Sequence, residues 1–299
     1  MAGRGHGRSG YRMSSTEVGQ SARQAKRPAA LTRRQAHERA LRRRSMIVAA
    51  SSTLAVITAV VVLLPLTPGW ERVQASFFNA EVFANTFPKL LRAFLLDVAI
   101  FAWSAPLIAA LGLAIALARD VRNPVLYPLR LFGAVYTDIF RGVPVVLVVY
   151  LVGFGIPGLG LPRPWNSPYI WGTVALVLTY SAYVAEIFRS GIESVHQSQR
   201  NAALSLGLSG GDMMRFVVLP QAIRRVIPAQ MNMLIALQKD VALLSFIGPV
   251  EIFRQAGVFK SLLANFTPYV VAACIFLVVT VPATRLADHL IAKQHKARS

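Results

Sequence analysis

Long apolar stretches are the feature of this sequence that most limits its fold. A helix needs about 20 mostly apolar residues to cross the ~30 Å hydrocarbon core of a bilayer. Six stretches reach or approach that length: residues 46–65, 98–118, 142–161, 169–185, 227–247 and 266–284. Lipid cannot satisfy an unpaired backbone amide or carbonyl group, and a helix satisfies its own. We therefore predict an all-α integral membrane protein with about six transmembrane helices.

The basic residues predict the orientation of these helices. Cytoplasmic loops of membrane proteins carry an excess of Lys and Arg. With the N-terminus inside, the cytoplasmic segments hold 25 basic residues and the external segments hold six. Both termini are therefore predicted to be cytoplasmic in a multi-pass protein.

The same reasoning divides the chain into five segments. Residues 1–44 are interpreted as a disordered basic tail, because they combine twelve Lys or Arg with few apolar residues. This tail is expected to fix orientation and contact anionic lipid, rather than bind nucleic acid; an organelle transit peptide is the alternative. The other segments are an additional N-terminal transmembrane helix (45–66), an external amphipathic segment (67–94), a helical core (95–290) and a basic cytoplasmic C-terminal tail (291–299).

A polar stretch inside the core, residues 192–222, is predicted to be a cytoplasmic loop of two short helices. Ser198 is a candidate N-cap for the first helix, and Gly207 lies where a left-handed residue would end it. Ser209 and Asp212 have the spacing of a capping box for the second helix. Just before the loop, Glu186 is spaced to pair with Arg189 on one helix face, and Arg189 with Glu193.

Several ordered motifs carry a resemblance to a known family. The loop motif resembles the EAA loop of ABC importer permeases; its matching residues are Asn201, Ala202, Ala203, Gly207, Phe216, Leu219 and Pro220. Residues 136–144, which contain Arg141, Gly142 and Pro144, are similar to the start of a span in the polar amino-acid branch of that family. Residues 182–192 and 239–243 are similar to two further runs of that branch. The resemblance covers residues 95–299 and implies a five-helix permease core, to which one N-terminal span is added.

The resemblance also implies partners and a location. In such permeases the loop is seated in a groove of a separate cytoplasmic ABC ATPase, and an extracytoplasmic binding protein delivers the amino acid. A second permease subunit, identical or different, completes the assembly in the bacterial cell membrane. The sequence has no Gly-x-x-x-x-Gly-Lys-Ser/Thr motif, so ATP and Mg²⁺ are expected on the ATPase. The chain itself is expected to bind no cofactor or metal and to be non-catalytic.

One residue departs from the family motif. Asn201 stands where the family has an acidic residue. If Ser198 is the N-cap, Asn201 occupies the third helical position, where Glu would favour the helix dipole. We hypothesise that this subunit couples less symmetrically to its ATPases, and an unchanged transport-coupled ATPase rate in Asn201→Glu would contradict this.

Four charged residues are candidates for the translocation path: Lys239, Asp240, Arg141 and Glu186. Lys239 and Asp240 interrupt an apolar stretch, where each costs about 2.5–3.5 kcal/mol to insert. They either line a substrate path or form structural salt bridges to neighbouring spans. Arg141 is expected to anchor its helix at the interface or to gate the inner mouth, and Pro144 to fix the start of the next helix. Glu186 is expected to pair with Arg189.

The function predicted from these observations is the permease subunit of an ATP-driven importer for a polar amino acid of the glutamate, glutamine, arginine and histidine class. Two alternatives remain open. One is a secondary transporter driven by an ion gradient, and the other is a membrane scaffold whose loop docks a cytoplasmic partner.

Overall fold

Residues 41, 44–121 and 123–296 are described by the structure, which is a computed structural model of the chain. The predicted tail at residues 1–44 lies outside them except for Leu41 and Arg44. The regular structure of the described part is entirely helical, which confirms the predicted all-α class. Four helices are long and apolar enough to cross a membrane, and six spans result if two bent helix pairs each count as one.

The chain divides into two compact units, Met1–Glu71 and Arg72–Ser299. In the first unit a helix runs over Arg44–Leu63, where the sequence predicts the additional span. None of the residues in its most apolar window is buried. An uncovered apolar helix of 20 residues has the length that a bilayer core requires.

The second unit contains, near its start, a helix much longer than the predicted span at residues 98–118. After the short helix α2 (Trp70–Phe77), α3 runs over Ala80–Asp120 and is capped by Asn79, whose side chain accepts a 3.0 Å hydrogen bond from the Val82 amide. The second half of the predicted external segment, residues 67–94, is therefore continuous with this span in one helix, and its external position stays a prediction. Leu90 and Phe94 pack against α10 and α11, so this part of α3 is held by tertiary contacts rather than by its own hydropathy.

The predicted third span at residues 142–161 is not one straight helix. It starts at the last residue of α4 (Tyr127–Gly142) and contains α5 (Val145–Gly155) and a short 3₁₀ helix (Pro157–Leu159), and the segment before residue 143 meets the one after residue 144 at an angle of 105°. Pro144 is the residue before α5 and has no amide hydrogen to donate back into α4. Gly142 is the last residue of α4, and the sequence interpretation assigned most of α4 to a loop because it carries Arg130 and Arg141.

The remaining helices follow the predicted order with shifted ends. α6 runs over Pro168–Glu193, α7 over Gln197–Ser205 and α8 over Gly210–Asp212. A π-helix, Met213–Val218, leads into α9 (Leu219–Asp240), and a 3₁₀ helix, Val241–Ile247, follows it. α10 (Ile252–Leu263) comes next, and α11 (Thr267–Lys296) extends six residues into the predicted C-terminal tail.

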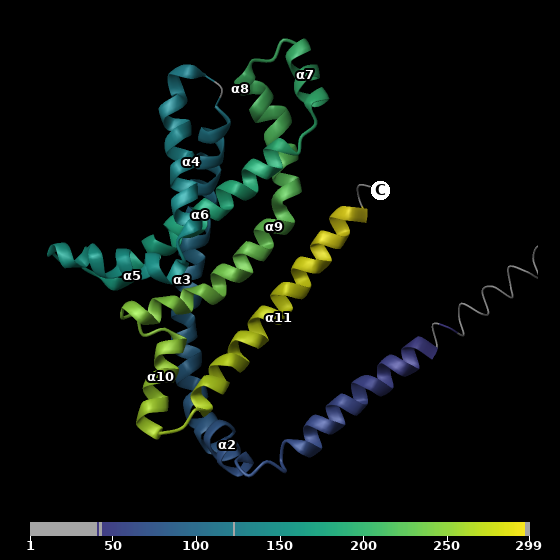
Figure 1. The fold of residues 1–299 in the computed structure, drawn as a ribbon. Coiled ribbons are helices and arrows are strands. Elements are labelled where there is room, and N and C mark those ends of the chain that lie inside the picture. The colour runs from purple at the N-terminus through teal and green to yellow at the C-terminus, as the bar shows by residue number, and fades with distance from the viewer. Residues whose placement is uncertain (1–40, 42–43, 122, 297–299) are drawn as a thin grey trace, which may run out of the picture. The chain divides into compact units, whose positions relative to one another are not determined.

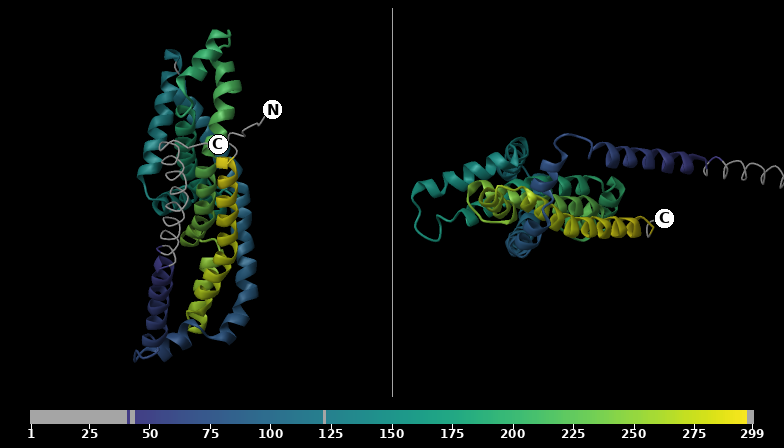
Figure 2. Two further views of the ribbon diagram at one scale, coloured as in Figure 1. Left: turned by 90° about the vertical axis from the view of Figure 1, so that its right-hand side faces the viewer. Right: turned by 90° about the horizontal axis from the view of Figure 1, so that it is seen from below.

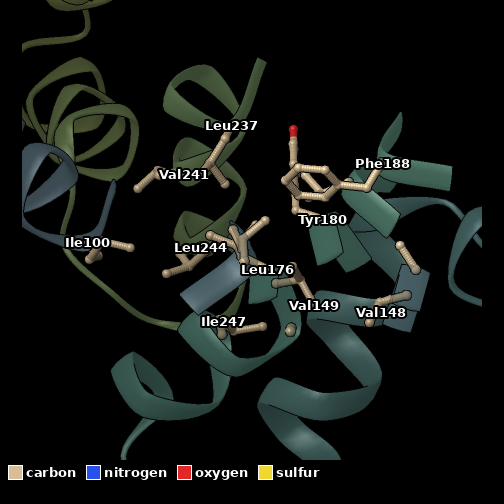
Figure 3. Close-up of a cluster of buried hydrophobic side chains, with 14 of the residues drawn as sticks. Ile100, Val148, Val149, Leu176, Tyr180, Phe188, Leu237, Val241, Leu244 and Ile247 are labelled. Carbon is tan, nitrogen blue, oxygen red and sulfur yellow. The ribbon is translucent and has the colours of Figure 1, made fainter. Parts of the chain in front are cut away.

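The core of the second unit lies where α3, α5, α6, α9 and the following 3₁₀ helix meet. Leu176 and Tyr180 of α6, Leu237 of α9 and Leu244 of the 3₁₀ helix are buried side by side there (Figure 3). Gly112 permits the close approach of α3 to α6, since a Cβ at that position would lie 2.4 Å from Val184 Cγ1. Figures 1 and 2 show that α7 and α8 lie at one end of this unit and α10 at the opposite end.

Candidate functional site

The first helix of the loop between α6 and α9 begins two residues earlier than predicted. His196 is the N-cap of α7, and its Nδ1 accepts from the Ser198 amide at 3.3 Å and lies 2.8 Å from the Ser198 hydroxyl. Ser198 is therefore not the N-cap, because the imidazole of His196 already accepts the amide hydrogen that a cap must satisfy. Asn201 is then not the third helical residue, and its Oδ1 instead accepts from Gln197 Nε2 at 2.9 Å. The capping argument for the effect of Asn201 is wrong.

The turn between α7 and α8 has the predicted geometry. Gly207 has a φ of +81°, and the Leu208 amide donates to the Ala203 carbonyl at 3.2 Å. This left-handed residue ends α7 at low cost because glycine has no Cβ. Ser209 Oγ accepts from the Asp212 amide at 3.1 Å, which confirms Ser209 as the N-cap, and it donates to Asp212 Oδ2 at 2.6 Å, where a capping box would have the Ser209 amide as the donor.

A buried cluster fixes the loop to the rest of the unit. Ile192 at the end of α6 packs with Val218 of the π-helix and Ala222 of α9, and Leu117 of α3 lies against this cluster. Arg200 of α7 is also buried, and its guanidinium donates to the Ile192 carbonyl at 2.7 Å. These contacts connect the loop to α3, α6 and α9.

The exposed face of the loop differs from the predicted one. Ala203 is buried inside the chain, so the Ala202–Ala203 pair does not form a free small-residue face. The exposed apolar residues are Leu204, Leu206 and Phe216, and Leu206 is 84% exposed. Of these three residues, the loop motif had selected Phe216 alone. Which side of a helix faces outward depends on the elements that pack against it, and the local sequence does not show them.

The π-helix at Met213–Val218 was not predicted. It leads directly into α9, whose first turn contains Leu219 and Pro220. Proline lacks the amide hydrogen needed in a regular helix interior, and it is tolerated at a helix start. Pro220 therefore lies in a continuous helical segment, and no separate turn precedes the predicted fifth span. π-helical turns are rare and are often found at functional sites.

Glu186 is the centre of a charged network that joins three helices. Its Oε2 lies 3.0 Å from Arg119 Nη1 of α3 and 3.5 Å from Arg141 Nη1 of α4, and its Oε1 accepts from Arg189 Nε at 3.0 Å. Arg189 also pairs with Glu193. The predicted pairing within α6 is confirmed, whereas the partners on α3 and α4 were missed because nothing in the local spacing indicates a contact between helices.

Lys239 and Asp240 are adjacent in the sequence, but their side chains have different surroundings. Asp240 Oδ2 accepts a 2.7 Å hydrogen bond from the Tyr180 hydroxyl of α6. Lys239 is exposed. Among the residues that the structure describes, neither forms the salt bridge to another span that was one of the two interpretations. An exposed ammonium group in an apolar helix requires a partner outside this chain or contact with water.

Comparison with known proteins supports a transport function. Residues 111–296 match the family model described as binding-protein-dependent transport system inner membrane component. The chain is 34% identical over 211 residues to the probable amino-acid permease protein YxeN of Bacillus subtilis, which covers 70% of this chain and 92% of that protein. It is also 34% identical over 188 residues to the probable glutamine ABC transporter permease protein GlnM of the same species, with 62% of this chain and 84% of that protein covered.

A solved structure has a similar fold. The crystal structure of an amino acid ABC transporter with histidines contains a chain that is 30% identical, with a TM-score of 0.64. The match covers 70% of this chain and 96% of that one. The similarity therefore includes nearly the whole of the solved chain.

Proposed function

The chain belongs to the family of binding-protein-dependent transport system inner membrane components, and we propose that it forms the translocation path for a polar amino acid in an ABC importer. As a multi-pass membrane protein of this family it is a permease subunit. Its relatives include a probable glutamine permease, and the similar solved structure contains histidines. Glutamine, glutamate, histidine and arginine form the proposed substrate class.

The observation that carries this proposal is the loop of α7 and α8. It presents Leu204, Leu206 and Phe216 on its surface and is fixed to α3, α6 and α9 by the cluster around Ile192. An exposed apolar patch on a rigid support is typical of a protein docking site. We propose that this patch is seated on a cytoplasmic ATPase, which would place both termini in the cytoplasm. ATP and Mg²⁺ would be bound by the ATPase, and this chain would be non-catalytic.

Two further partners follow from the same proposal. A second permease subunit would face the exposed Lys239, so that Lys239 and Asp240 would line a path between the two subunits. An extracytoplasmic binding protein would deliver the amino acid at the end of the bundle that carries α10, opposite the loop (Figures 1 and 2). Arg141 and Glu186, which pair with each other, are assigned to maintaining the helix arrangement rather than to touching substrate.

The docking proposal predicts a large effect of Leu206→Asp. Because Leu206 is almost fully exposed, an aspartate there should not disturb folding, but it would place a charge in a desolvated interface. We expect the variant to express and unfold like the wild type, and its copurification with the ATPase subunit to fall by at least tenfold. The measurement is the ATPase-to-permease ratio after affinity purification of the tagged chain from its own membranes.

Leu159→Asp is the matched control, since Leu159 is also exposed but lies in a short helix after α5. This variant should keep the ATPase. Loss of ATPase from both variants would mean that membrane insertion had failed. Retention in both would contradict docking through the loop and would favour the secondary transporter, whereas recovery of a non-ATPase protein on the loop would favour the scaffold.

A further inference from the structure

A groove beside α10 combines the chemical groups that a carboxylate requires. It has a volume of about 450 Å³ and lies between the 3₁₀ helix after α9, α10 and the start of α11. Its polar lining consists of Arg254, Ser245, Ser261 and Tyr269. One guanidinium and three hydroxyl groups are all able to donate hydrogen bonds, and none of the lining residues is acidic.

The guanidinium of Arg254 is held in position but has donors left over. Its Nη1 donates to the Ser245 carbonyl at 2.8 Å, and the described residues supply no other acceptor to it. The backbone of α10 is fixed beneath it, because the buried Glu251 accepts from the amides of Phe253 and Arg254 at 2.7 Å each. A guanidinium with free, preoriented N–H groups is suited to bind a carboxylate through two parallel hydrogen bonds.

Ser245 provides a second, independent indication of a ligand. The residue is 6% exposed and is one of those that line the groove, and its hydroxyl is buried without a hydrogen-bond partner among the described residues, so a ligand reaches it once the side chain turns towards the groove. A buried polar group without a partner costs roughly 1–3 kcal/mol, so such a group calls for an explanation. A ligand oxygen bound by Arg254 would supply that partner.

The apolar lining restricts what the rest of the ligand can be. The ring centroids of Phe253 and Tyr269 lie 5.4 Å apart. Gly257 leaves room between α10 and Tyr269, since a Cβ there would lie 3.1 Å from the Tyr269 hydroxyl oxygen. An aromatic face attracts an ammonium group. A guanidinium or ammonium on the ligand's own side chain, however, would find no carboxylate in this groove and would lose its hydration without compensation.

We propose that this groove is an outer binding subsite for the α-carboxylate of an amino acid whose side chain is an uncharged amide, as in glutamine. The inference rests on the proposed import function and narrows its substrate class. The groove lies at the end of the bundle opposite the α7–α8 loop, where an amino acid delivered from outside would first meet the chain (Figures 1 and 2). Arg254 would bind the carboxylate, Ser245 would donate to one of its oxygens, and the aromatic pair would face the α-ammonium group.

Binding of radiolabelled glutamine to the full-length chain in phosphatidylcholine nanodiscs tests this subsite. Arg254→Gln should weaken binding by at least tenfold, because a hydrogen bond to a charged group contributes about 1.5–3 kcal/mol. Ser245→Ala and Tyr269→Phe, which each remove one hydroxyl, should weaken it by roughly two- to tenfold. Unlabelled arginine should compete at least tenfold less well than unlabelled glutamine.

Lys260→Gln is the matched control, because it removes the same charge from the same helix. The Lys260 ammonium lies over the Phe266 ring and outside the groove, so this variant should bind like the wild type. Equal losses in Arg254→Gln and Lys260→Gln would show a general field effect and overturn the subsite. An unchanged Arg254→Gln, or a wild-type chain that binds no glutamine, would overturn it as well.

A lipid phosphate offers similar chemistry, and changing the lipid distinguishes the two sources. Glutamine affinity should be the same in phosphatidylglycerol nanodiscs; displacement of glutamine by this anionic lipid would assign the groove to a headgroup and overturn the proposal. Failure of the import function is recognised separately, by absence of an ATPase bound to the loop. An importer that keeps its ATPase but whose glutamine binding ignores Arg254 would refute the subsite alone.

Discussion

Replacing Glu186 with alanine should lower the free energy of unfolding by about 2–3 kcal/mol and uncouple ATP hydrolysis from transport. Breaking a buried ion pair costs roughly 3–5 kcal/mol. The loss expected for Glu186 is somewhat smaller, because its side chain is 23% exposed. The loss is large because one carboxylate serves Arg119, Arg141 and Arg189 on three helices. Without it, three guanidinium groups repel one another where α3, α4 and α6 meet.

The measurement is unfolding of the purified chain in detergent, followed by helical circular dichroism, together with substrate-stimulated ATPase activity of the reconstituted importer. Coupling should suffer because α6 leads directly into the loop, and the network holds that end of α6 against α3 and α4. We expect stimulation to fall at least tenfold while basal hydrolysis by the ATPase remains.

Glu193→Ala is the comparison that separates this network from ordinary surface charge. Glu193 is 59% exposed and, among the described residues, pairs with Arg189 alone, so its removal should cost less than about 1 kcal/mol. Similar small effects in both variants would contradict the central role of Glu186. A Glu186→Gln variant with wild-type stability would do the same, since an amide keeps the size but not the charge.

Local patterns in the sequence predicted local structure well. Gly207 and the N-cap at Ser209 depend on neighbours within three or four residues, and both have the expected geometry. Segment length and hydropathy were sufficient for the all-α membrane class. The error at Ser198 has the same local origin, because His196 competes for the same role and its ring nitrogen is a less common cap than a serine hydroxyl.

Contacts between helices were what the sequence did not reveal. Arg119 precedes Glu186 by 67 positions, and no periodicity joins them. The extent of α3 was underestimated for the same reason: Leu90 and Phe94 belong to the bundle only because α10 and α11 fold back onto them. Pro144 was expected to fix the start of the next helix, and the bend between α4 and α5 was not predicted.

The proposed docking and binding surfaces also combine residues that local patterns indicate with residues that only contacts between helices reveal. Phe216 was selected from the loop motif, whereas Leu206 became a candidate only when its exposure was known. Arg254 was counted as one external basic residue among six, and its importance appears only with Ser245 beside it. A side chain acquires a binding role from neighbours that the chain brings to it, and single-sequence patterns describe those neighbours poorly.

Gly112→Ala should destabilise the chain by about 1–3 kcal/mol, the usual cost of an extra methyl group in a packed interface. A Cβ on Gly112 would lie 2.4 Å from Val184 Cγ1, 2.8 Å from Val184 Cβ and 3.1 Å from the Ser181 carbonyl oxygen. Rotation of the Val184 side chain can relieve only the first of these contacts, so α3 and α6 must separate. Gly155→Ala is the control, because a Cβ at Gly155 meets nothing within 4 Å, and it should leave the unfolding midpoint unchanged or slightly raised.

A second substitution tests whether this contact is the cause. Val184→Ala removes Cγ1 and should by itself cost about 0.5–1.5 kcal/mol through the lost packing. In the double variant the methyl group added by Gly112→Ala would occupy part of the vacated space. The stability lost in the double variant should therefore be about 1 kcal/mol smaller than the sum of the two single losses. Simple additivity would mean that Gly112 is needed for the conformation of α3 rather than for its approach to α6. A shortfall would show that the spacing of these two helices, which carry Arg119 seven residues after Gly112 and Glu186 two residues after Val184, is set by the absence of a side chain at Gly112.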